Sequence, residues 1–132
     1  MKHCILVVED NQLNLELLRD WLEVEGYVVW SAAELNASYE VFSKQLPDAV
    51  LLDINLGSDS GLDLLSWMRQ KPETREIPVI AVTAHALATE QEEILQAGCK
   101  ACLPKPIDFQ LLRKELNRWL RDSKTSQTIS LI

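Results

Sequence analysis

Four nearly continuous apolar runs, each about six residues long, constrain the fold of this chain more than any other feature. Such runs are typical of parallel β-strands that are covered on both faces, because a strand with one wet face alternates apolar and polar residues. A shorter fifth run follows near the carboxyl end of the chain. The sequence therefore predicts five strands, at residues 4–9, 27–32, 49–54, 79–84 and 101–103.

Longer amphipathic segments separate these runs and predict helices at residues 11–25, 34–45, 61–71, 87–97 and 108–121. Glycine and proline mark the ends of several elements, as at Gly26, Pro72 and Gly98. Five strand–helix units in series predict an α/β fold, a doubly wound five-stranded parallel sheet with helices on both faces. A chain of 132 residues has the length of one domain, which we place at residues 1–121. Residues 122–132 are predicted to form a polar C-terminal tail, too short for an output domain.

Charge and cysteine content limit the possible surroundings and partners. A net charge of −7 argues against a chain that grips a nucleic-acid backbone, since that would require a basic face. No apolar run approaches the length of a membrane span. Three cysteines without an apolar signal segment indicate the reducing cytoplasm. We expect a cytoplasmic protein with no nucleic-acid or membrane partner, present as a monomer or a weak dimer.

Polar residues stand where four of the five predicted strands end. The first strand ends at Glu9 and Asp10, the third ends at Asp53, the fourth ends at Thr83 and the fifth reaches Lys105. In an open α/β sheet, ligands bind beyond the carboxyl ends of the strands, where the strand order reverses. If the second strand lies at the edge, the other four ends converge, and the acids would line a cation site.

The chemistry of clustered carboxylates indicates which cation this would be. Two unit charges 4 Å apart interact by about 4 kcal/mol at an effective dielectric near 20, so three close carboxylates either take up a proton or hold a cation. Mg²⁺ suits such a site because it keeps several waters and binds one or two carboxylates together with phosphate oxygens. Any one of these acids alone could be a solvated residue at a strand end. The pattern over four strands favours magnesium.

At these residues the chain resembles the receiver domain of two-component response regulators, the CheY-like family, over about residues 3 to 121. The resemblance rests on the acid pair after the first strand, on LLD in the third, on Thr-Ala after the fourth and on Lys-Pro after the fifth. The opening EDNxxN is similar to the receivers of hybrid kinases and of stand-alone phosphorelay proteins. The resemblance implies a flavodoxin-like sheet with the strand order 2-1-3-4-5.

The resemblance also implies a metal site and a phosphoacceptor. Asp53 would be the phosphoacceptor, attacking the phosphorus of a phosphohistidine. Asp10 and Asp53 would ligate Mg²⁺ directly, and Glu9 would do so through water. Asn55 would contribute its backbone carbonyl, which any residue type could supply.

Two further residues would bind the phosphoryl group itself. Lys105 would pair with its oxygens, and Thr83 would donate its hydroxyl to the phosphorylated form; the Lys105–Pro106 bond would be cis. These roles agree with phosphoryl transfer, which needs an in-line nucleophile and cations where charge collects. The expected function is that of a stand-alone phosphoacceptor and not an enzyme. It would receive its phosphoryl group from a sensor histidine kinase or a histidine phosphotransfer protein and then bind a downstream protein target.

Two positions depart from the family's pattern. Gly57 stands where the family usually carries proline, so we expect the loop after Asp53 to be less pre-organised. Cys102 stands where the family usually has Tyr or Phe, whose ring turns inward when the threonine moves. We therefore expect signalling to run through the Thr83 loop and the helix after it. Cys99 and Cys102 form a CxxC, but no helix start or further zinc ligand accompanies it, so we interpret them as ordinary buried or half-buried cysteines.

The helix predicted at residues 11–25 has a wide apolar surface. Its apolar residues spread over roughly 200° of the helical wheel, whereas a core-facing helix needs a stripe of about 100° or more. The surplus edge, with Leu15 and part of Trp21, is a candidate docking strip for a helical phosphodonor, although Trp21 could equally cap the core. Asn14 lies inside the apolar arc at the first turn, and we expect it to turn toward the acids.

Three other functions remain open at this point. A metal-dependent phosphatase that uses an aspartyl-phosphate would commonly have a second aspartate two residues after the first, where this chain has Asn55. A receiver-like binding module that is no longer phosphorylated would not need Asp53, Thr83 and Lys105 together. A flavin or dinucleotide protein would carry a glycine-rich phosphate loop after the first strand, which is absent here.

Overall fold

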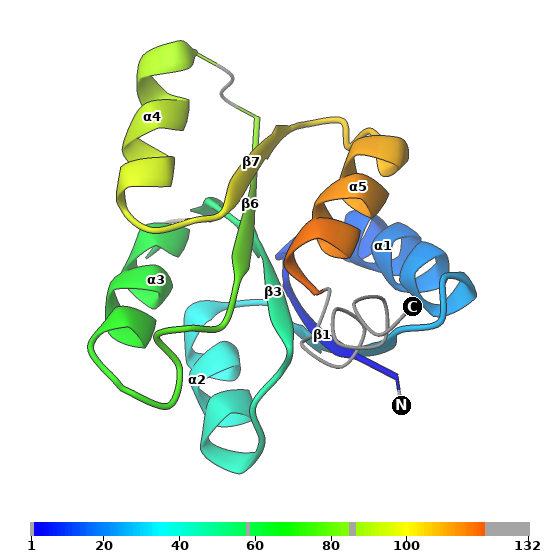
Figure 1. Cartoon of the computed structure of the whole chain (residues 1–132), viewed down its shortest axis with the longest axis horizontal. Helices are drawn as coiled ribbons and strands as arrows, with labels where there is room; N and C mark the ends of the chain where they lie inside the picture. The colour runs from blue at the N-terminus through cyan, green and yellow to red at the C-terminus, as the bar shows by residue number, and fades with distance from the viewer. Residues whose placement is uncertain (1, 58, 85–86, 121–132) are drawn as a thin grey trace, which may run out of the picture.

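A five-stranded parallel sheet forms the centre of the computed structural model, which describes residues 2–57, 59–84 and 87–120 (Figure 1). Its spatial order is β2-β1-β3-β6-β7, which corresponds to the predicted order 2-1-3-4-5. The tail predicted at residues 122–132 lies outside the described residues. The strands of the sheet are β1 (Cys4–Val8), β2 (Val28–Ala32), β3 (Ala49–Asp53), β6 (Val79–Thr83) and β7 (Ala101–Pro104).

Helices cover both faces of the sheet, so the doubly wound α/β prediction is confirmed (Figure 1). One face packs against α1 and α5, and the other packs against α2, α3 and α4. None of the described helices is long and apolar enough to cross a membrane. The helices are α1 (Gln12–Val24), α2 (Leu35–Lys44), α3 (Gly61–Arg69), α4 (Ala88–Gln96) and α5 (Phe109–Trp119).

The continuous apolar runs are explained by this two-sided burial. Successive side chains of a strand point to opposite faces of the sheet. In β1, Leu6 and Val8 join the core layer beneath α2, α3 and α4, while Ile5 and Val7 join the layer beneath α1 and α5. A polar residue at any of these positions would lie inside one of the two layers.

A small antiparallel hairpin follows β3 directly and was not predicted from the sequence. It consists of β4 (Asn55–Leu56) and β5 (Asp59–Ser60), in which Asn55 pairs with Ser60 and Leu56 pairs with Asp59. Gly57 lies in its turn with a φ of +58°, a left-handed conformation that proline cannot adopt. The glycine in place of the family's proline therefore belongs to a different backbone path after Asp53.

Candidate functional site

The predicted acids meet at the carboxyl ends of β1 and β3. The two strands are neighbours, with Val8 opposite Leu52, so Glu9 and Asp10 come out of the sheet beside Asp53. One carboxylate oxygen from each of the three acids lies within 4.8 Å of the others. Glu9 and Asp53 are each only 3% exposed, whereas Asp10 is exposed. The convergence predicted from the sequence is confirmed.

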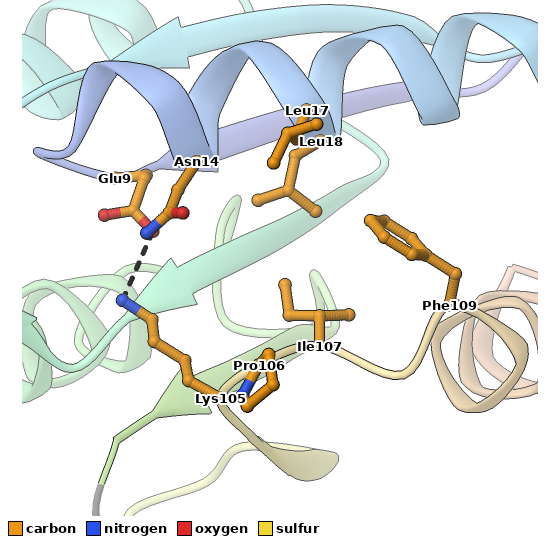
Figure 2. A pocket seen from close by; sticks show the side chains of 8 residues that line it. All are labelled: Glu9, Asn14, Leu17, Leu18, Lys105, Pro106, Ile107 and Phe109. Carbon is orange, nitrogen blue, oxygen red and sulfur yellow. Dashed lines mark ion pairs between the residues drawn. The ribbon is translucent and has the colours of Figure 1, made fainter.

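Lys105 joins this cluster from the end of β7. Its Nζ lies 3.3 Å from Oε1 of Glu9 (Figure 2). The same Nζ lies 2.9 Å from Oδ2 of Asp53. The lysine is half-buried and contributes one positive charge beside three carboxylates. The four residues together therefore carry an excess of negative charge when all are ionised.

Burial and the neighbouring charges together shift the pKa values of Glu9 and Lys105. Burial, and then the neighbouring Asp53, raise the pKa of Glu9 above its usual range, although the Asn11 N–H that donates to Oε2 over 3.1 Å opposes the shift. Burial by itself lowers the pKa of Lys105, but the carboxylates of Asp53 and Glu9 outweigh it and raise the pKa. The lysine is therefore held as a cation, and the acid pair would gain from further positive charge.

Backbone amides hold the acidic side chains in place. The Asn55 N–H donates to Oδ1 of Asp53 over 3.0 Å, while Lys105 binds Oδ2, so both oxygens of this carboxylate have a fixed partner. Asn55 is exposed at the start of the hairpin.

A Cβ at Gly61 would lie 2.6 Å from the Asp53 carbonyl oxygen, so only glycine lets α3 begin this close to β3.

Thr83 is buried at the last position of β6, next to both neighbouring strand ends. Asp53 is opposite Val82 in the β3–β6 pair, and the Thr83 carbonyl accepts from the Lys105 N–H over 2.8 Å. The sheet thus brings Thr83 to the same rim as the acids and the lysine. The Lys105–Pro106 bond is cis, as the resemblance implied.

The two cysteines of the CxxC are free thiols, as predicted. Cys99 is buried, and burial, together with the nearby Cys102, raises its pKa to about 12. Burial also raises the pKa of the half-buried Cys102. A thiol with a raised pKa is a poor nucleophile and a poor metal ligand at neutral pH, so both residues behave as small apolar side chains.

The predicted docking strip on α1 is wrong in one of its members. Leu15 is only 6% exposed, because it lies with Leu18 and Leu22 on the stripe that faces the sheet. The exposed apolar residues of α1 near the site are instead Leu13, at 66%, and Leu17, at 55%. Trp21 is half-buried, and its ring centroid lies 5.1 Å from that of Phe109 on α5.

A pocket of about 400 Å³ opens beside the acid cluster, between α1 and the connection from β7 to α5 (Figure 2). Its polar end holds Asn14 together with two members of the cluster, which confirms that Asn14 turns toward the acids. The rest of its wall is mostly apolar. The residues that line it are Glu9, Asn14, Leu17, Leu18, Lys105, Pro106, Ile107 and Phe109.

The sequence also matches the family model of the response regulator receiver domain, over residues 5–117. The chain belongs to this family. The receiver domain is 37% identical to the polar-differentiation response regulator DivK of Brucella anthropi over 123 residues, which are 93% of this chain and 100% of the relative. The resemblance inferred from the strand-end motifs is thereby confirmed.

Solved structures agree with this assignment. A response regulator structure from Chloroflexus aurantiacus superposes on the receiver domain with a TM-score of 0.86 and 30% identity, covering 92% of this chain and all of that one. The receiver domain of a sensor histidine kinase from Pseudomonas aeruginosa superposes with a TM-score of 0.83 and 33% sequence identity, covering 92% of this chain and all of that one. That structure holds a magnesium ion in its active-site cleft. As a member of this family, the chain is a two-component signalling protein. Receiver domains act in signalling and are not conventional enzymes.

Proposed function

We propose that this receiver domain accepts a phosphoryl group on Asp53 from a phosphohistidine of a sensor kinase or a phosphotransfer protein. The observation that carries the proposal is the setting of Asp53, a buried carboxylate with a cation on one oxygen and two further acids within 4.8 Å. A carboxylate kept only for stability would not be gathered with like charges. Phosphorylation would then change the surface that the domain presents to a downstream protein.

The donor set fits a magnesium ion. Three carboxylates lie together with one lysine, so the cluster has fewer positive than negative charges when all four groups are ionised. Asp10 and Asp53 would bind the ion directly, Glu9 through water, and Asn55 through its backbone carbonyl. When bound, Mg²⁺ supplies positive charge to the phosphoryl oxygens during transfer. The magnesium ion in the similar Pseudomonas receiver supports this assignment.

The residues of the chain orient and stabilise the transfer. The Asn55 N–H and Lys105 each hold one oxygen of Asp53, so the carboxylate meets the phosphorus in a defined direction. As the O–P bond forms and the N–P bond breaks, Lys105 would follow the negative charge onto the phosphoryl oxygens, and Thr83 would donate its hydroxyl to them. The product is a mixed anhydride that water hydrolyses readily, which makes the signal self-limiting.

Phosphorylation would change the contacts of two residues at the site. Lys105 already binds Asp53 and would exchange this ion pair for one with the phosphoryl oxygens, whereas the hydrogen bond from the Thr83 hydroxyl to those oxygens would be new. One charge-assisted hydrogen bond contributes about 1.5–3 kcal/mol, which is enough for a partial shift of a two-state equilibrium. A complete shift from 1:99 to 99:1 needs about 5.5 kcal/mol. Since Cys102 lacks a ring that could swing inward, we propose that the change runs from Thr83 through its loop to α4.

Labelling with a small phosphodonor tests the proposal. The protein is incubated with acetyl phosphate and Mg²⁺, and its intact mass is followed with time. We expect a gain of one phosphoryl group that depends on Mg²⁺ and is absent in Asp53→Ala. Asp20→Ala serves as the matched control, because Asp20 is an exposed aspartate on α1, and it should be labelled like the wild type.

Three outcomes would contradict this function. An unlabelled wild-type protein that binds its partner all the same would indicate a receiver that is no longer phosphorylated. Repeated turnover of phosphomonoesters would instead support a phosphatase that passes through Asp53. Labelling that survives Asp53→Ala would place the phosphoacceptor elsewhere in the chain.

A further inference from the structure

Asn14 differs from the other polar residues that line the pocket beside the acid cluster. Glu9 and Lys105 are paired with each other, and Lys105 also holds Asp53. The Asn14 side-chain amide forms no hydrogen bond with any residue in the described part of the chain. Figure 2 shows it beside the Glu9 carboxylate on the α1 side of the pocket, across from Lys105. Its capacity to donate and accept is therefore available to a ligand.

The helix itself does not need this side chain. The backbone N–H of Asn14 is already satisfied by Oδ1 of the N-cap residue Asn11, at 3.0 Å. An apolar residue would suit this half-buried position on a mostly apolar wall. A polar side chain that neither the helix cap nor the packing of the wall requires is more readily explained by a functional role than by stability.

The pocket offers a place for the ring of a phosphohistidine donor. Asp53 is almost completely buried, so a donor must approach it from the rim, where Lys105 borders the pocket. An imidazole ring is flat, with apolar faces and one nitrogen at each side. Leu17, Ile107 and Phe109 can pack against such a ring while its phosphoryl group points to Lys105 and Asp53.

We propose that Asn14 binds the imidazole ring of the phosphodonor, an inference that rests on the proposed function of Asp53. Its carboxamide oxygen accepts a hydrogen bond from the ring N–H on the side opposite the phosphorylated nitrogen. In the transfer, an Asp53 oxygen forms the new bond to phosphorus, and the P–N bond breaks with its electron pair staying on nitrogen. The ring, protonated at its other nitrogen, leaves as neutral imidazole.

A neutral acceptor suits this position better than a charged one. The hydrogen bond that the ring N–H donates to Asn14 favours the ring form that carries a proton on its second nitrogen, which is the form that leaves easily. A carboxylate here would add a negative charge to a site that already has an excess of it. It would also compete with Asp53 for Lys105.

Two donors that differ only in the leaving group test the inference. The rate of labelling is measured by intact mass with phosphoimidazole, which carries the ring, and with acetyl phosphate, which does not. We expect Asn14→Ala to slow labelling by phosphoimidazole about tenfold, as expected for one lost hydrogen bond to a charged group, and to change the acetyl phosphate rate by less than about twofold. The acetyl phosphate rate also shows that the variant is folded.

Asn36→Ala provides the matched control, because Asn36 is an exposed asparagine on α2, and its rates should equal those of the wild type with both donors. An equal loss with both donors in Asn14→Ala would overturn the inference, since Asn14 would then act on Asp53 or Lys105 and not on the ring. Unchanged rates with both donors would also overturn it. A wild type that neither donor labels would instead contradict the proposed function itself.

Discussion

The interior of the sheet and its carboxyl-end rim belong to the same strands but differ in what they bury. Val8 and Leu52 are fully buried apolar residues, and the next residue in each strand, Glu9 and Asp53, is buried almost as completely although it is a carboxylic acid. Burying apolar surface stabilises a fold by about 25 cal/mol per Å². Burying a carboxylate costs several kcal/mol unless it is paired, and among the residues that the structure describes Lys105 alone forms an ion pair with Glu9 and Asp53. The difference teaches that stability comes from the interior, whereas the carboxylates at the rim carry a cost in stability that a bound cation would relieve.

The interior should show the larger loss of stability. Leu52→Ala removes a fully buried side chain from the layer beneath α2, α3 and α4, so it should lower the free energy of unfolding by about 2–5 kcal/mol. Urea unfolding without Mg²⁺, followed by circular dichroism, measures this change. A loss below about 1 kcal/mol would mean that the strand interior is not the source of stability that the comparison requires.

A substitution among the buried acids at the rim should instead raise the free energy of unfolding. Burial, and then Asp53, raise the pKa of Glu9 above its ordinary value of 4.5, so ionising Glu9 costs stability in the folded protein. Glu9→Gln should therefore raise the free energy of unfolding of the metal-free protein near neutral pH, in the same urea experiment. It should also lower Mg²⁺ affinity by about 10–100-fold, as removal of an outer-sphere ligand does.

The pH dependence of this change provides its control. Between pH 4.5 and the raised pKa of Glu9, the folded protein binds more protons than the unfolded chain, so its stability falls as the pH rises through that interval. Glu9→Gln lacks this titration. The stability difference between the two proteins should thus be smallest at low pH and should grow toward neutrality. A constant difference would attribute the gain to something other than the buried charge.

Gly57, in the hairpin that follows Asp53, tests how much the backbone beside the site contributes to stability and to Mg²⁺ binding. Its φ of +58° is left-handed, and a side chain in that conformation costs about 1–2 kcal/mol. Gly57→Ala should therefore destabilise the fold by about that amount, less than the core substitution. A Cβ there would lie 3.8 Å from Oδ2 of Asp10, within van der Waals contact, so Mg²⁺ binding measured by calorimetry should change little. A strong loss of Mg²⁺ affinity would show that the hairpin itself positions Asp10.

The strands and the residues of the candidate site were predicted from the sequence, whereas the hairpin and one residue of the docking strip were not, for a physical reason. The continuous apolar runs predict the five parallel strands, and the strand-end residues predict that Glu9, Asp53 and Lys105 meet, because parallel strands place their ends at one edge. The strand order itself came from the resemblance to the receiver family. The hairpin after β3 was missed, because two-residue strands contain no periodicity. The docking strip was assigned to Leu15 because a wide apolar arc does not itself specify which edge faces the sheet.

Cys102→Ala should have the smallest effect of these substitutions. It tests whether position 102, where the family usually has an aromatic ring, transmits the change caused by phosphorylation. The residue is half-buried against the core layer beneath α2, α3 and α4, so Cys102→Ala removes only one sulfur atom from that contact. We expect three quantities to stay within about twofold: the labelling rate with acetyl phosphate, the rate of dephosphorylation and the affinity for the downstream partner. The reason is that the loss of one half-buried sulfur atom should change the free energy by under about 1 kcal/mol. Cys4→Ala, at the opposite end of the sheet, is the matched control. If Cys102→Ala abolished partner binding while Cys4→Ala did not, the path through Thr83 and α4 would be wrong, because β7 would then carry the change from the phosphorylated rim to the surface.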